Sequence, residues 1–174
     1  MSGPLLSANE IRDLLTDLGA RLAADGIEGR LFVVGGAAMA LAYNRERITR
    51  DVDAIFEPKS VVYDAATRLA AERKLPPDWL NDSVKGLVPD IADRAVTTAF
   101  TAPGIAVQVA GPEYLFAMKA FAARVETDGQ DLRTLAGILG VSSAGQALAI
   151  VERYYGASRL SPKTALLLEE LFGT

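Results

Sequence analysis

The chain has 174 residues, of which 50% are apolar and 23% are charged, and its formal net charge is −4. This length and composition fit one globular domain with a substantial core, and the negative charge argues against broad, charge-driven binding to nucleic acid. Cysteine and histidine are both absent, which excludes disulfides, thiolate nucleophiles, zinc–thiolate sites and histidine as a general base.

The first part of the chain predicts a helix, a strand, a glycine turn and a second helix. Ser7 suits an N-cap, and apolar residues at helical spacing predict a helix over residues 8–24. Leu31–Val34 is an apolar, partly β-branched run that predicts a strand ending at Gly35–Gly36. The alanine-rich segment after the glycines predicts a helix over Ala37–Tyr43.

The next strand is predicted from an alternation of acidic and apolar side chains. The run Asp51–Phe56 has period two, so a strand here points both of its carboxylates to the same face. Two like charges held close together are unfavourable without a cation. Three arginines precede the run, within Asn44–Arg50. Pro58 is expected to close the strand, and Ser60 to cap a helix that runs to about Lys74.

The middle of the chain predicts loops and then two further strands. Residues 78–95 are mixed in character and predict short helices and loops. Val96–Phe100 and Ile105–Val109 are β-rich runs separated by Pro103–Gly104, a pattern typical of an antiparallel hairpin or of neighbouring strands.

From Pro112 onward the pattern is helical. We expect four helices: from Pro112 to near Val125, from Asp128 or Gly129 to Ile138, from a Ser142 or Ser143 cap to Tyr154, and from Ser161–Pro162 to near Gly173. The expected fold is therefore mixed α+β, a small mixed sheet flanked by helices. We expect a single domain over residues 1–174, with a sheet-containing core at 1–111 and a helical C-terminal part at 112–174.

Neither a membrane span nor a signal segment is predicted. No apolar run approaches the eighteen or so residues of a span, and the Met1–Pro4 start lacks a basic stretch followed by an apolar signal core. A cytoplasmic location without a membrane partner is the default expectation.

The paired carboxylates and the glycine turn together indicate chemistry on phosphates. A Gly-Gly pair alone is usually only a tight turn, and an Asp-x-Asp pair alone is usually a solvated strand face. In this order they supply carboxylates for a metal and backbone N–H groups for phosphate, the two needs of phosphoryl transfer. Because only oxygen ligands are at hand, a hard cation such as magnesium is favoured over zinc.

These residues resemble a known signature. Gly35-Gly36 followed by Arg47-x-Thr49-x-Asp51-x-Asp53 is similar to the signature of the polymerase-β-type nucleotidyltransferase superfamily. The likeness is to its minimal bacterial branch, with the AbiEii-type and MenT-type toxins of toxin–antitoxin and phage-defence pairs. It continues in Tyr114-Leu115-x-x-Met118-Lys119 and Asp128-x-x-Asp131-Leu132, so that it spans about residues 31–133.

The resemblance implies transfer of a nucleoside monophosphate from a nucleoside triphosphate to an acceptor hydroxyl, with release of pyrophosphate. In the toxin branch the acceptor is commonly the 3′ end of tRNA, and a cognate antitoxin protein restrains the enzyme. A local patch of arginines and lysines could contact a tRNA end even in this acidic chain.

The resemblance also implies a role for each motif residue. Asp51 and Asp53 would hold magnesium, and Gly35 and Gly36 would cradle the triphosphate of the substrate. Four further residues complete the implied site: Arg47 reaching the phosphates, Thr49 offering a hydroxyl near the metal, Lys119 contacting the phosphates as a point charge, and Asp131 orienting that lysine or the acceptor.

One position departs from the family pattern. Many superfamily members carry a third carboxylate on a later strand, where this chain offers Gln108, which is neither an anionic ligand nor a base. The base role could pass to Asp131, or to the metal alone, or activity could be lost. The alternatives to an RNA-modifying toxin are therefore a nucleotidyltransferase that modifies a small molecule, such as an antibiotic, or a protein, and a non-catalytic member that binds nucleotide or a partner.

Overall fold

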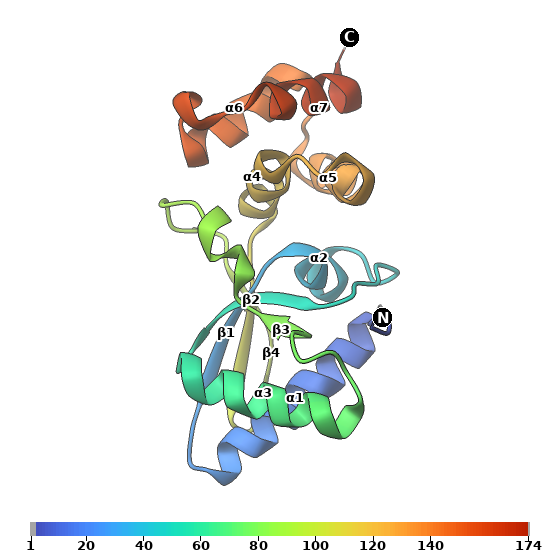
Figure 1. Cartoon of the computed structure of the whole chain (residues 1–174). Helices are drawn as coiled ribbons and strands as arrows, with labels where there is room; N and C mark the ends of the chain where they lie inside the picture. Colours follow the sequence, from blue (N-terminus) through green and yellow to red (C-terminus); the bar gives the residue numbers. More distant parts are fainter. Residues whose placement is uncertain (1–2, 174) are drawn as a thin grey trace. The chain divides into compact units, whose positions relative to one another are not determined.

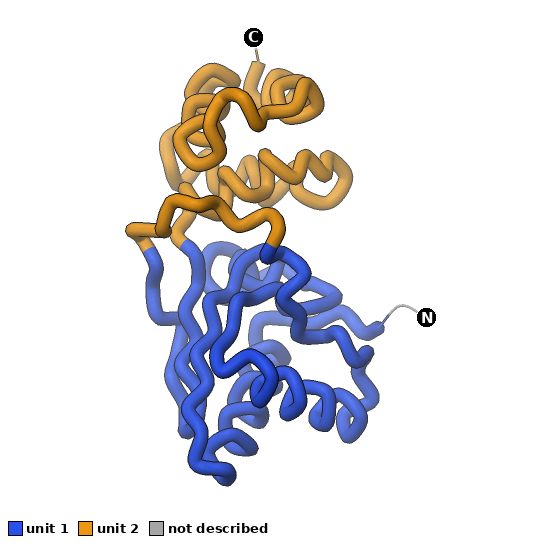
Figure 2. The backbone as a smooth tube through the Cα atoms, turned by 60° about the vertical axis from the view of Figure 1, so that its left-hand side comes forward, with its two compact units in different colours: residues 1–85, 96–110 blue, residues 86–95, 111–174 orange. Residues whose placement is uncertain are grey.

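The computed structural model describes residues 3–173, so that Met1, Ser2 and Thr174 lie outside the described residues. The chain forms two compact units (Figure 2). The first unit consists of Met1–Lys85 and Val96–Ala110, and the second of Gly86–Ala95 and Gly111–Thr174. Each unit is described below by itself.

The first unit contains a five-stranded mixed sheet, which confirms the expected α+β class. The strand order is β3-β2-β1-β5-β4. β1 pairs antiparallel with β2 and parallel with β5, β3 runs parallel to β2, and β4 and β5 form the predicted antiparallel hairpin. The strands are β1 (Gly29–Val33), β2 (Val52–Glu57), β3 (Leu80–Asn81), β4 (Thr97–Ala102) and β5 (Ile105–Val109).

Helices α1 (Ala8–Ala24) and α3 (Lys59–Arg73) pack on the sheet and on each other (Figure 1). Ser7 caps α1 as predicted, because its hydroxyl accepts from the Glu10 backbone N–H while the Glu10 carboxylate accepts from the Ser7 N–H. The prediction that Ser60 caps α3 was wrong. The helix starts at Lys59, directly after Pro58, and the N-cap makes no side-chain hydrogen bond.

The segment after β1 is helical from the glycines onward. α2 (Gly35–Ala38) continues into a π-helical turn over Met39–Tyr43, so that the glycines form the first turn of the predicted helix instead of preceding it. The predicted β2 strand is confirmed, and its Val52, Ala54 and Phe56 side chains are buried. The predicted loops at residues 78–95 contain an unpredicted two-residue strand, β3.

The second unit contains four helices, as predicted: α4 (Pro112–Ala122), α5 (Val125–Leu139), α6 (Ala144–Tyr155) and α7 (Pro162–Phe172). Ser143 caps α6, and Ser161 caps α7. Two boundaries were predicted wrongly. Ala123 adopts a left-handed conformation, with φ of 52°, which ends α4 three residues early and lets α5 begin at Val125 instead of at Asp128 or Gly129.

Among residues 3–173, no single helix has the length and apolar character needed to cross a membrane. α5 and α6 reach that length and composition only when they are taken together, across a bend of 94°.

Candidate functional site

The glycine turn after β1 leaves room for three polar side chains. Gly35 has a φ of +64°, and a Cβ atom placed on it would lie 3.1 Å from the Asp53 Oδ2. A Cβ atom on Gly36 would lie 2.9 Å from the Thr49 Oγ1 and 3.2 Å from the Arg47 Nη2. The missing side chains therefore let a carboxylate, a hydroxyl and a guanidinium approach the backbone of one turn.

The two predicted carboxylates share a face of the chain at β2. Val52 and Ala54 are buried, whereas Asp51 and Asp53 are half-buried, so that the alternation expected from the sequence holds. The Thr49 hydroxyl donates to the Asp51 carbonyl oxygen at 3.2 Å. The Val34 N–H donates to the Asp53 carbonyl oxygen at 2.9 Å, which fixes the start of the glycine turn against β2.

Asn81 belongs to this site and was not predicted. β3 pairs with β2 so that Asn81 lies opposite Asp53, and the Asn81 amide donates to the Asp51 Oδ2 at 3.3 Å. The Asn81 side chain also accepts from the Ser83 hydroxyl and backbone N–H, at 2.6 and 3.1 Å. These contacts hold the amide in place beside the carboxylate.

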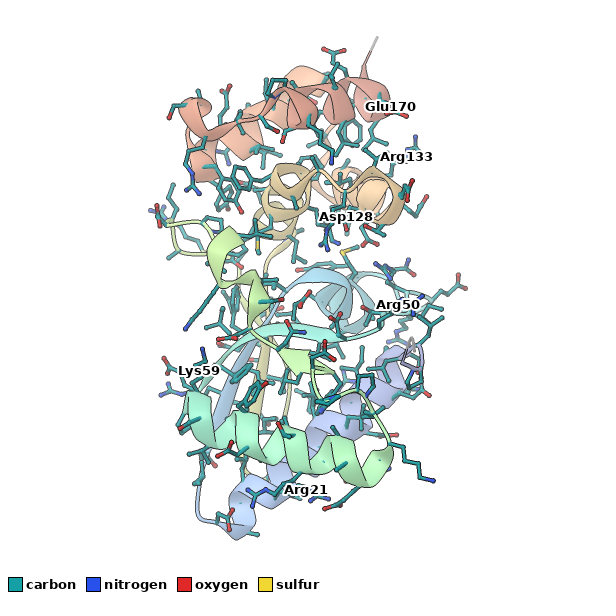
Figure 3. The ribbon with its side chains drawn as sticks, viewed as in Figure 1. Arg21, Arg50, Lys59, Asp128, Arg133 and Glu170 are labelled. Carbon is teal, nitrogen blue, oxygen red and sulfur yellow. The ribbon has the colours of Figure 1, made fainter. Side chains whose placement is uncertain are left out.

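The loop before β2 is tied to the start of the chain. Leu6 and Thr49 exchange two backbone hydrogen bonds, of 2.7 and 3.0 Å, in an isolated antiparallel bridge. The Leu6 side chain is buried. The bridge therefore fixes the backbone from which Arg47 and Thr49 reach the glycine turn. Figure 3 labels Arg50, which follows Thr49 on the same loop.

The donor atoms at Asp51 and Asp53 suit a hard cation. Magnesium is commonly bound by one or two carboxylates and completes its octahedron with water and substrate phosphates. Within residues 3–173 no group of three or more His, Cys, Asp or Glu side chains is placed to hold a metal. The residues present thus fit an ion that binds together with its phosphate substrate, and they do not form a closed protein cage.

Gln108 lies on the same face of the sheet as Asp53. Ile55, two residues beyond Asp53, pairs with Phe32 on β1, and Phe32 pairs with Gln108 on β5. Directly paired residues point to the same face of a sheet. Gln108 is exposed, so that an uncharged amide stands on the strand where a third carboxylate was sought.

The second unit holds the other two predicted residues in a buried ionic cluster. The Lys119 Nζ lies 2.9 Å from the Asp128 Oδ1 and 2.9 Å from the Asp131 Oδ2. The Arg124 Nε lies 3.2 Å from the Asp128 Oδ2. Lys119, Asp128 and Asp131 are only 3%, 2% and 1% exposed. Two cations and two anions thus compensate one another, as buried charges require.

Asp128 was quoted in the sequence motif but was not expected at the site. It lies in the first turn of α5 (Figure 3), and Asp131 follows one turn later on the same face. The Asp128 N–H also donates to the Arg124 carbonyl oxygen at 2.8 Å. The three-residue spacing of Asp128 and Asp131 was the signal in the sequence that both acids lie on one face of a helix. Because the helix was predicted to begin at Asp128 or Gly129, Asp128 was not expected to lie within it beside Asp131.

Three tyrosines of the second unit pack against other aromatic rings. The rings of Tyr114 and Tyr154 meet edge to face, with centroids 5.7 Å apart, and Tyr155 stacks on Phe121 at 3.9 Å. Burial, together with the nearby charge of Asp93, raises the pKa of Tyr114 to about 12, and burial also raises the pKa of Tyr155. The Tyr155 hydroxyl donates to the Leu87 carbonyl oxygen. These hydroxyls therefore stay protonated near neutral pH.

The structure brings six of the eight predicted residues together in the first unit: Gly35, Gly36, Arg47, Thr49, Asp51 and Asp53. It places Lys119 and Asp131 side by side in the second unit.

The chain was compared with known protein families, curated proteins and solved structures. A family model described as nucleotidyltransferase of unknown function (DUF6036) matches residues 10–143, which include all of the residues described above except Leu6 and the tyrosines of α6. No significant match to a curated protein or to a solved structure was found.

Proposed function

Since the chain belongs to the DUF6036 family of nucleotidyltransferases of unknown function, we propose that it transfers a nucleoside monophosphate from a nucleoside triphosphate to an acceptor hydroxyl in a magnesium-dependent reaction. The observation that carries this proposal is the convergence of Asp53, Arg47 and Thr49 on the Gly35–Gly36 turn, with Asp51 held beside them by the hydrogen bond from Thr49. The acceptor that we propose is the 3′ end of tRNA, and the biological role is that of a toxin held in check by an antitoxin protein.

The residues of the first unit bind and orient the triphosphate. Asp51 and Asp53 are the residues that would hold the metal, which supplies neutralisation of phosphate charge and alignment of the reacting oxygens. The glycine turn presents backbone N–H groups without a side chain in the way. Arg47, whose guanidinium already lies against Gly36, adds charge-assisted hydrogen bonds to phosphate oxygens.

Asn81 acts on the metal-binding carboxylate in this scheme. Its amide donates to the Asp51 Oδ2, which limits rotation of that carboxylate. Thr49 fixes the backbone of the same residue. The carboxylates are thereby oriented before the substrate binds.

Lys119 supplies a positive charge in a fixed orientation. An ammonium group has three N–H donors, and Asp128 and Asp131 face two of them. We propose that this positive charge acts on the phosphates of the substrate, the role that the family resemblance implies. Because Asp131 is buried against Lys119, we assign it a positioning role and do not use it as the general base.

The chemical step is an in-line displacement at the α-phosphorus. The acceptor oxygen forms a bond to phosphorus while the bond to the bridging oxygen of pyrophosphate breaks, and pyrophosphate leaves with that electron pair. The proton of the acceptor hydroxyl passes to water. No step requires Gln108, which is consistent with an amide at that position.

The direct test is the destination of the label from each of the four α-³²P nucleoside triphosphates. The purified protein is incubated with magnesium and total tRNA, and the products are separated as RNA, protein and small molecules. Label in tRNA is expected. Label in protein or in an added aminoglycoside would replace the tRNA proposal with one of the two other acceptor classes. Absence of transfer to every acceptor would leave a non-catalytic binding protein.

The toxin role is tested separately in cells. Induced expression should arrest bacterial growth, and Asp51→Ala should abolish the arrest, while Asp64→Ala, which removes an exposed carboxylate on α3, should leave it intact. Equal growth arrest by wild type and Asp51→Ala would contradict a toxic role for the reaction.

A further inference from the structure

The first unit contains a hollow whose lining does not include the glycine turn. It has a volume of about 400 Å³ and lies between the start of α1 and the π-helical turn. Its lining includes Ser7, Asn9, Arg12, Ala40, Leu41 and Arg45. None of these residues belongs to the site built on Gly35, Gly36, Arg47, Thr49, Asp51 and Asp53. The hollow therefore offers a separate place for a ligand.

The charges that line this cavity are all positive. Arg12 and Arg45 line it, and no acidic residue does. Within residues 3–173 neither of these two arginines forms an ion pair, although the chain carries more acidic than basic residues. Like charges that share a cavity repel one another, and a bound anion offsets that repulsion.

Other contacts prepare the cavity for a ligand. The Arg12 guanidinium lies 4.9 Å from the centroid of the Phe100 ring, an arrangement that restricts its side chain without neutralising it. Asn9 offers an uncharged amide, while Ala40 and Leu41 supply an apolar wall. The volume lies within the range of small-molecule sites, about 300–1,000 Å³. A phosphate ester with an attached sugar or base matches this combination.

We propose that this cavity binds the phosphate group of a nucleotide-sized ligand between the guanidinium groups of Arg12 and Arg45. Guanidinium groups bind phosphate oxygens through paired N–H donors, so two arginines that line one cavity favour such an anion.

The chain connects this cavity to the candidate active site. Arg45 lies four residues before Thr49, in the loop that the Leu6–Thr49 bridge holds in place. The same loop thus carries Arg45, which lines the cavity, and also Arg47 and Thr49, whose side chains reach the glycine turn. If the proposed transfer to RNA holds, the occupant is a backbone phosphate of the acceptor strand, and this assignment rests on the proposed function.

The test measures binding without nucleoside triphosphate and without magnesium. Three probes are used: inorganic phosphate, adenosine 5′-monophosphate and a fluorescein-labelled single-stranded RNA of about ten nucleotides. The variants are Arg12→Gln, Arg45→Gln and both together. The matched control is Arg68→Gln, which removes an exposed arginine of α3 that lies outside the cavity.

Each cavity variant is expected to weaken binding about tenfold, and the double variant more than about fiftyfold, since each loses a charge-assisted hydrogen bond to phosphate. Arg68→Gln should stay within about twofold of the wild type, because a single exposed charge contributes little. Arg45 is exposed, so that Arg45→Gln tests the cavity even if Arg12→Gln disturbs the contact with Phe100.

The probes separate the sources of the phosphate. Weaker RNA binding by the cavity variants supports a nucleic-acid phosphate, and weaker binding of adenosine 5′-monophosphate or inorganic phosphate alone supports a free phosphate ligand. Either result upholds the cavity. The proposal is overturned if the wild type binds none of the probes or if the double variant binds all of them like the wild type. It is also overturned if Arg68→Gln loses as much affinity as the cavity variants.

Failure of the cavity and failure of the proposed function give different results. If the wild type transfers no nucleotide, but the double variant loses phosphate binding, the proposed cavity site is supported and the proposed enzymatic function is refuted. If the wild type transfers nucleotide, but the double variant binds all three probes normally, the proposed function is supported and the proposed cavity site is refuted.

Discussion

Asp51 and Asp53 in the first unit are half-buried on one face of the chain, whereas Asp128 and Asp131 in the second unit are buried against Lys119 and Arg124. The first pair lies within reach of solvent and of a ligand, and the second pair is compensated by cations of the chain itself. Substitution of the first pair is therefore expected to affect chemistry alone, whereas substitution of the second pair should also affect the fold. Substitutions in the two units should therefore separate activity from stability.

The largest expected effect is on the transfer rate of Asp53→Asn. The amide keeps the shape of the side chain but cannot hold the metal, so the initial rate of label transfer should fall on the order of 10³-fold. The midpoint temperature of thermal unfolding, followed by circular dichroism, should change by no more than about 2 °C. Asp64→Asn, on the exposed side of α3, is the control and should keep full activity. If the Asp53→Asn protein retains the wild-type rate, Asp53 has no role in the proposed active site.

The complementary change in the second unit is Lys119→Met. It leaves two buried carboxylates without their lysine, which should lower the free energy of unfolding by about 3–5 kcal/mol in a denaturant titration. Lys163→Met, at an exposed position of α7, should change it by less than about 0.5 kcal/mol.

A second variant checks the cause of this loss. Adding Asp128→Asn and Asp131→Asn to Lys119→Met should recover stability, because no uncompensated charge then remains buried. If Lys119→Met is as stable as the wild type, the cluster has no structural role and the contrast between the units fails.

The sequence was sufficient for the elements whose local signals agree. Three local signals each mark a structure that the backbone adopts: the Ser7 cap, the alternation at Asp51–Phe56 and the Pro103–Gly104 turn. Six residues of the candidate site could be named because they lie close together in the sequence, on one strand, one turn and the loop between them.

The features that were not predicted depend on backbone conformation and strand pairing that a short sequence pattern does not specify. β3 is two residues long, too short for any periodicity, so the contact of Asn81 with Asp51 could not be foreseen. α5 begins early because Ala123, a residue without a preference for positive φ, adopts the left-handed conformation. That early start is what buries Asp128 beside Lys119.

A smaller effect is expected from Gly36→Ala. The added methyl group would lie 2.9 Å from the Thr49 Oγ1 and 3.2 Å from the Arg47 Nη2, so both side chains must move away from the turn. We expect the KM for nucleoside triphosphate to rise about tenfold, the equivalent of about 1.4 kcal/mol of lost binding. Gly137→Ala in α5 has no neighbouring atom within 4 Å and serves as the control. It should keep the KM and stabilise the helix by up to about 1 kcal/mol. An unchanged KM in Gly36→Ala would argue against a triphosphate at this turn.

The smallest effect is a loss of stability of the second unit at alkaline pH. The pKa of Tyr114 is raised to about 12, and the pKa values of Tyr154 and Tyr155 are also raised, chiefly by burial. The folded state therefore retains these protons more tightly than the unfolded state. The resulting stabilisation is complete below the ordinary tyrosine pKa near 10 and is lost as the pH rises through the folded values.

Ultraviolet titration of tyrosinate absorbance measures this effect. The Tyr114→Phe protein should lose one of the late-titrating groups. Titration of every tyrosine near pH 10 in the folded protein would contradict the burial of these hydroxyls.

Nucleotidyl transfer itself is tested most directly by moving the label within the substrate. The protein is incubated with magnesium, tRNA and a nucleoside triphosphate that carries ³²P at either the α- or the γ-phosphorus. We predict that the α-label enters the RNA and that the γ-label is released as pyrophosphate, with both signals lost in Asp53→Asn. Transfer of the γ-label to the acceptor, or the absence of both transfer and pyrophosphate release with all four nucleotides, would contradict a nucleotidyltransferase centre at the Gly35–Gly36 turn.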